Sequence, residues 1–103
     1  SLNGETLMMV LITYDVSTET EAGKKRLHKV AKYCQDYGQR VQNSVFECVI
    51  DPARLKILKD KLEKVIDVEK DSIRYYYLGD EWRNRVEHVG AKASIDLEGT
   101  LIV

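Results

Sequence analysis

One carboxylate, Asp15, stands at the end of an apolar run that begins at Met9. Apolar, β-branched runs of this length are typical of a strand that is buried on both faces of a sheet. Aspartate is rare in strands, because its side chain competes for backbone hydrogen bonds and is costly to bury without a partner. Asp15 is therefore either a cap for the loop that follows or a placed functional group.

The chemistry open to Asp15 is metal binding, because Mg²⁺ takes carboxylate oxygens as ligands. Phosphodiester cleavage needs an activated water and neutralisation of the phosphate's developing charge, and one or two such ions supply both. One chain offers only Asp15 at a position of this kind. Two-fold symmetry would double it, so two copies of Asp15 could hold an ion if a homodimer brought them together. Without a cation, the two carboxylates would repel each other.

Six further residues are candidates for nucleic-acid binding: Tyr14, Lys24, Lys25, Arg40, Ser44 and Phe46. Tyr14 alternates to the opposite face from Asp15, so core packing is the favoured role of its ring. Phe46 shares a strand face with Cys48 and Ile50, which favours the core in the same way. A serine in a tight turn usually caps it, and lysines on a charged helix usually form a solvated face. Cations that do contact phosphates position a backbone without reading its sequence.

Length, charge and cysteine content exclude several classes of protein. A chain of 103 residues makes one small domain, and 16 Lys and Arg against 17 Asp and Glu give no general attraction for nucleic acid. No apolar run reaches the roughly 18 residues that span a bilayer, and no signal-peptide pattern opens the chain, so we expect a cytoplasmic protein without a membrane partner. Cys34 and Cys48 form no CxxC or Cys/His cluster, which disfavours a zinc site and predicts two buried thiols.

Hydrophobic periodicity predicts the elements that must position Asp15. We expect a strand over 9–16, a helix from about 21 to 37, two short strands around a turn at 43–44, a helix from Asp51-Pro52 to about 67, and a strand over 72–79. A single bent strand is the alternative to the two short strands. At the start of the first helix, a capping box fits Thr18, and Thr20 is an alternative N-cap. Gly38 is expected to end that helix with a positive φ.

This order of elements predicts an α+β fold, a ferredoxin-like βαββαβ sandwich with a C-terminal strand extension. The domain is expected at 8–80, after an expression leader at 1–7. The extension at 81–103 includes a candidate short strand at 86–89. Because the sheet face without helices carries apolar side chains, a second copy is its simplest cover, and the extension would reach across to the partner's sheet edge.

Three segments carry a resemblance to a known family: Tyr14-Asp15-Val16 at the end of the first strand, Arg-Val-Gln-Asn-Ser-Val-Phe-Glu at 40–47, and Ile-Arg-Tyr-Tyr at 73–76. The motifs are short, but their order and spacing in so small a chain are fairly specific. From Met8 onward, the chain resembles the CRISPR-associated protein 2 family, a small adaptation-module endonuclease and partner of the spacer-acquisition integrase. The Val-Glu-His-Val-Gly segment at 86–90 and the Leu-Ile-Val end are similar to members from type I-C systems.

The resemblance implies a homodimer whose two strand-end aspartates face each other across the interface. It implies a metal-dependent endonuclease on double-stranded DNA or RNA, with Asp15 as the catalytic residue and as a ligand of Mg²⁺, or alternatively Mn²⁺, shared with the dimer mate. It also implies an adaptor of spacer acquisition that works with the CRISPR integrase, CRISPR-associated protein 1. Ser44 and Phe46 match the family's Ser-x-Phe. The loop at 17–21 lacks arginines that some relatives carry there, which counts against an arginine-assisted cut of RNA.

Two other functions fit the same residues. One is a non-catalytic DNA-binding scaffold of the integrase complex, and the other is a toxin-like ribonuclease of the same fold. A small-molecule regulatory module ranks last, because the chain lacks a glycine-rich ligand loop. Fold alone decides none of these alternatives.

Overall fold

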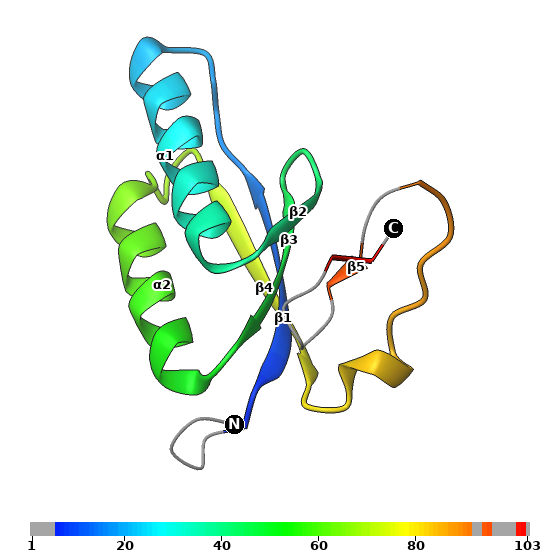
Figure 1. Cartoon of the computed structure of the whole chain (residues 1–103). Coiled ribbons are helices and arrows are strands. Elements are labelled where there is room, and N and C mark those ends of the chain that lie inside the picture. Colours follow the sequence, from blue (N-terminus) through cyan, green and yellow to red (C-terminus); the bar gives the residue numbers. More distant parts are fainter. Residues whose placement is uncertain (1–5, 92–93, 96–100, 103) are drawn as a thin grey trace.

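A four-stranded antiparallel sheet, in the order β2-β3-β1-β4, carries both α-helices on one face (Figure 1). The computed structural model describes residues 6–91, 94–95 and 101–102. The arrangement is the ferredoxin-like α+β fold that the order of elements predicted. The bounds are β1 Met8–Asp15, α1 Glu21–Tyr37, β2 Gln39–Gln42, β3 Val45–Ile50, α2 Pro52–Val65 and β4 Ser72–Gly79.

The central strand β1 pairs with β3 on one side and with β4 on the other. Its side chains alternate, so that Val10, Ile12 and Tyr14 are buried in the core that includes the helices. Leu11 and Thr13 point to the second face and are only partly buried. The prediction of a strand buried on both faces is thus confirmed for the face toward the helices. On the second face, the side chains of Leu11 and Thr13 are only partly buried within one chain.

Side chains cap the starts of both helices. Thr20 Oγ1 accepts a hydrogen bond from the Gly23 amide at 3.0 Å, so α1 uses the alternative cap. Asp51 Oδ1 accepts from the Arg54 amide at 2.8 Å, and Pro52 occupies the first turn, as predicted. In the described part of the chain, no helix is both long enough and apolar enough to cross a membrane.

Gly38 ends α1, but the prediction of a positive φ is wrong. Its φ is −154°, which is extended backbone that any residue adopts. A Cβ at this position would lie 2.5 Å from Cys48 Sγ and 2.6 Å from the Glu47 carbonyl oxygen. Close packing of the helix end against β3 therefore requires glycine here.

The main core lies between the helices and the sheet. Its largest fully buried side chains are Phe46, Ile12, Leu58, Leu62, Val10, Val30, Cys34 and Cys48. Along β3, Phe46, Cys48 and Ile50 are buried on one face, as the sequence alternation predicted. Both cysteines are free, and burial raises the pKa of each thiol to about 12.

The segment that follows β4, at 80–91, lies on the opposite side of the sheet from the helices (Figure 1). There Trp82, in the short helix η2 Trp82–Asn84, is buried, which the sequence pattern did not reveal. The strand expected at 86–89 is wrong, because two valines three positions apart would face opposite ways in a strand, and Val89 is 89% exposed. Short strands do occur further on, where β5 Ser94–Ile95 pairs with β6 Leu101–Ile102. Their reach onto a second copy stays a prediction.

Candidate metal and nucleic-acid site

Asp15 is the last residue of β1, and its side chain is exposed. Within the described residues, its carboxylate forms no hydrogen bond to the following loop and no ion pair. The helix after that loop is capped by Thr20 instead. The capping role that the sequence left open for Asp15 is therefore not the one observed, and the carboxylate oxygens remain available to a ligand.

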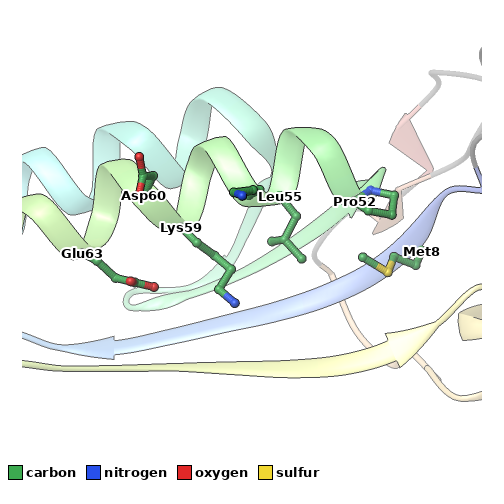
Figure 2. A pocket seen from close by; sticks show the side chains of 7 residues that line it. Met8, Pro52, Leu55, Lys59, Asp60 and Glu63 are labelled. Atoms are coloured by element: carbon green, nitrogen blue, oxygen red, sulfur yellow. The ribbon is translucent and has the colours of Figure 1, made fainter.

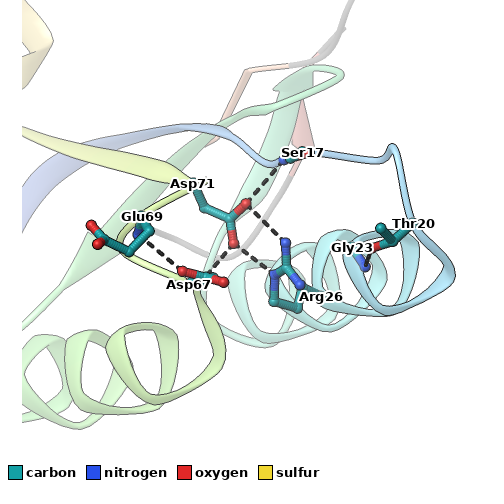
Figure 3. Close-up of polar contacts among 7 residues, drawn as sticks. All are labelled: Ser17, Thr20, Gly23, Arg26, Asp67, Glu69 and Asp71. Carbon is teal, nitrogen blue, oxygen red and sulfur yellow. Dashed lines mark hydrogen bonds and ion pairs between the residues drawn. The ribbon is translucent and has the colours of Figure 1, made fainter.

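Asp71 has a fully buried carboxylate that fixes the backbone beside Asp15 (Figure 3). Its Oδ1 accepts a hydrogen bond from the Ser17 amide at 3.0 Å. Its Oδ2 accepts from Arg26 Nε and from the Asp67 amide, both at 2.8 Å. This cluster, which we call the Asp71 clamp, ties the loop after β1 to helix α1 and to the turn before β4.

The Arg26 guanidinium holds the pKa of the Asp71 carboxyl at about 2, with help from the two backbone amides and against the effect of burial. The clamp therefore stays ionised over the ordinary pH range. Sequence reasoning missed it, because Arg26 and Asp71 are 45 positions apart and Arg26 stands among lysines that are solvated. No local signal marks the clamp, because the closeness of Asp71 to the end of β1 follows from the pairing of Ser72 with Asp15 in the folded sheet.

The second sheet face carries polar groups near Asp15. In the antiparallel pairing of β1 and β4, Asp15 lies opposite Ser72, and Thr13 lies opposite Arg74. Directly opposed residues share a face, so Arg74 is on the same face as Asp15. Further along this face, burial raises the pKa of Glu47, and the charge of His88 opposes that rise.

Four of the six nucleic-acid candidates gather on the other side of β1. The Tyr14 and Phe46 rings stack with centroids 6.2 Å apart, and the Arg40 guanidinium lies 5.1 Å from the Phe46 centroid. The Tyr14 amide donates to the Ser44 carbonyl at 3.1 Å, which ties β1 to the hairpin turn. Phe46 is fully buried and Tyr14 is 7% exposed, so the core-packing alternative is confirmed for both rings. Burial also raises the pKa of Tyr14.

The two lysine candidates lie in the first turns of α1, where both are exposed. Lys24 Nζ is 3.2 Å from Glu21 Oε1, in an ion pair whose side chains are mostly solvated. Such pairs hold their partners weakly, so Lys24 and Lys25 remain open to an external phosphate. Figure 1 places this end of α1 beyond the end of β1 that carries Asp15.

Metal-ligating side chains are not clustered in the described part of the chain. Within the residues that the structure describes, no group of three or more His, Cys, Asp or Glu side chains is placed to hold an ion. Mg²⁺ in proteins often keeps several waters and takes only one or two carboxylates. The exposed Asp15 carboxylate fits such an ion as one ligand, and the other positions around the ion would be open to water or to groups from outside the described chain.

A cavity on the helix side of the sheet is remote from Asp15 (Figure 2). It has a volume of about 320 Å³ and lies along α2, where its lining extends from Pro52 to Glu63 and also includes Met8, the first residue of β1. At about 3.3 Å for each strand residue, Met8 and Asp15 lie roughly 23 Å apart along β1. The cavity lies between α2 and the sheet, whereas Asp15 shares the second face of the sheet with Thr13, so the cavity is not part of the candidate site.

A family model described as CRISPR associated protein Cas2 matches residues 8–86. The chain belongs to the Cas2 family. The matched residues include the whole sheet with both helices, so membership covers the fold that positions Asp15.

Individual Cas2 proteins are similar over almost the full chain. A CRISPR-associated endoribonuclease Cas2 from Nitratidesulfovibrio vulgaris is 60% identical over 97% of this chain and 98% of its own length. A CRISPR-associated endonuclease Cas2 from Halalkalibacterium halodurans is 62% identical, over 92% and 99%. The crystal structure of Streptococcus pyogenes Cas2 at pH 6.5 is 61% identical, with a TM-score of 0.70 over 81% of this chain and all of that one. The type I-C assignment stays a prediction.

Proposed function

We propose that this chain is a metal-dependent nuclease that hydrolyses phosphodiester bonds of double-stranded DNA or RNA. The observation that carries the proposal is the Asp15 carboxylate, which is exposed at the end of the central strand and forms no bond within the described chain. The Asp71 clamp holds the backbone amide of Ser17, two residues after Asp15. It therefore fixes the backbone from which the Asp15 side chain extends. Relatives named endoribonuclease and endonuclease support the reaction class.

The proposed active form is a homodimer in which two Asp15 carboxylates hold Mg²⁺, or alternatively Mn²⁺. The second sheet face supports a dimer, since Leu11, Thr13, Val45 and Val49 are only partly buried there. A bound ion supplies an activated water and neutralises charge on the phosphate. The chain's own part is to fix Asp15, and the exposed Lys24 and Lys25 are placed to hold the nucleic-acid backbone.

The same dimer is proposed to act in the cytoplasm as an adaptor of CRISPR spacer acquisition, beside the integrase, CRISPR-associated protein 1. One observation favours a purely scaffolding alternative: the described residues contain no group of three or more side chains placed to hold a metal ion. A toxin-like ribonuclease is the less favoured alternative, because the loop at 17–21 carries no arginine.

The test is a cleavage assay on duplex DNA and on RNA, with Mg²⁺, Mn²⁺ or EDTA, for the wild type and for Asp15→Asn. We expect cleavage that EDTA and Asp15→Asn each abolish. Asp36→Asn is the matched control, since it removes a carboxylate from an exposed position of α1 and should leave the rate unchanged. Binding without cleavage would favour the scaffold, and cleavage of RNA alone would favour the ribonuclease. A monomeric mass by light scattering at micromolar concentration would contradict the dimer.

A further inference from the structure

Arg74 is the cation that the fold brings closest in register to Asp15 on the second sheet face. Asp15 lies opposite Ser72, and Arg74 is two residues further along β4. Such diagonal neighbours on adjacent antiparallel strands lie about 7–8 Å apart, which long side chains can span. Both side chains are exposed. A phosphate held beside Asp15 would therefore lie within reach of the Arg74 guanidinium.

The guanidinium of Arg74 is oriented but keeps free hydrogen-bonding capacity. Its Nη1 donates to the Tyr76 hydroxyl at 3.1 Å, and Tyr76 is 43% exposed on the same face. Arginine has five N–H donors, so this hydrogen bond leaves others for a ligand. No carboxylate among the described residues forms an ion pair with Arg74, so its charge is not neutralised within the chain.

The other cations near Asp15 are less suited to its ligand. The Arg26 guanidinium is occupied by the buried Asp71 carboxylate. Lys24 and Lys25 are open to a phosphate, but they lie on α1, beyond the end of β1 that carries Asp15 (Figure 1). The loop between β1 and α1, at 16–20, contains no cation. Because a phosphate under attack gains negative charge on its oxygens, a forked donor close to it stabilises the transition state more than a distant lysine does.

We propose that Arg74 binds the phosphate that is cut, next to the ion held by Asp15. The proposal rests on the proposed nuclease function and adds the substrate-binding cation to it. Arg74 transfers no proton and forms no covalent bond. Its guanidinium donates hydrogen bonds to the phosphate oxygens that do not leave.

The test compares Arg74→Gln and Arg74→Lys with the wild type in two assays. The first is binding of a 20-base-pair DNA duplex and of an RNA of the same length in EDTA, over a range of salt concentrations. If Arg74 neutralises one phosphate of the duplex, Arg74→Gln should flatten the plot of log affinity against log salt by about 0.9. The second is cleavage with Mg²⁺, in which we expect Arg74→Gln to lower kcat by about 100-fold, as removal of a donor to a developing anion does. Arg54→Gln is the control, because Arg54 is an exposed arginine of α2, near the other end of β1.

Arg74→Lys keeps the charge but removes the fork, so it should retain the salt slope while kcat falls. It also serves if Arg74→Gln does not fold. The proposal is overturned if Arg74→Gln has the same salt slope as the wild type. It is also overturned if the slope is flatter but kcat is unchanged, since the phosphate that Arg74 binds would then not be the one that is cut. If the wild type itself fails to cleave, the nuclease function is wrong, and the slopes in EDTA still decide whether Arg74 binds phosphate. The DNA and RNA arms show which backbone it binds.

Discussion

Asp71→Asn should weaken the fold at the point where β1 delivers Asp15. The substitution keeps the size of the side chain but removes the charge that lies 2.8 Å from Arg26 Nε. The pKa of Asp71 falls from an ordinary 3.8 to about 2, which at about 1.4 kcal/mol per pKa unit corresponds to about 2 kcal/mol. Arg26 is 17% exposed, so water screens only a small part of this pair. With a partly buried guanidinium left without its carboxylate, we expect a decrease of about 2 kcal/mol in the free energy of unfolding.

The assay is urea unfolding of Asp71→Asn and of the wild type at pH 7 and at low pH. Because the folded-state pKa of Asp71 lies below its unfolded value, its contribution is present above about pH 5 and disappears as pH falls toward 2. The difference between the two proteins should therefore shrink as pH falls. Asp60→Asn is the control, since its ion pair with Lys64 is mostly exposed and should be worth less than about 0.5 kcal/mol. A difference that stays constant with pH would refute the charge-based explanation of the clamp.

Hydrogen exchange connects the clamp to the site. The Ser17 amide donates to Asp71 two residues after Asp15, so Asp71→Asn should speed exchange at Ser17 more than at the amides of α2. Equal acceleration across the chain would mean that the clamp stabilises the fold in general and does not hold Asp15 in particular.

Three further predictions concern the core and the interface. Gly38→Ala should cost about 3 kcal/mol in urea unfolding, because its Cβ would lie 2.6 Å from a backbone oxygen of Glu47; wild-type stability would contradict this. Cys34 and Cys48, with thiol pKa values of about 12, should react with Ellman's reagent only at the rate of unfolding, and fast reaction in the native state would show them to be accessible. Without metal, Asp15→Asn should strengthen dimerisation in sedimentation experiments, because two facing carboxylates repel each other. An unchanged dimer dissociation constant would mean that the two Asp15 carboxylates do not face each other.

Local signals in the sequence were enough to predict most of the fold. Asp51-Pro52 identified a helix start, and the alternation of Phe46 with Cys48 identified the inner face of β3. Gly38 was correctly expected at the end of a helix, but for the wrong reason, because the cause is the approach of β3 and not the backbone angle. Patterns within a segment cannot report what a distant segment brings near.

The same limit applied to the candidate site. Asp15 stood out because a charged residue ends an apolar strand. The Asp71 clamp and Arg74 did not, because their roles depend on the pairing of β1 with β4 and on the packing of α1 against the turn before β4. Tyr14 and Phe46 carried both a core and a nucleic-acid interpretation until their burial was known.

Titration with Mn²⁺, followed by electron paramagnetic resonance, asks whether two Asp15 carboxylates hold one ion between two chains. For the wild type at micromolar concentration, we expect one bound ion for every two chains. Asp15→Asn should abolish that binding, and Asp36→Asn should keep it. One ion bound per chain, or binding that survives in Asp15→Asn, would contradict a metal site shared between two copies.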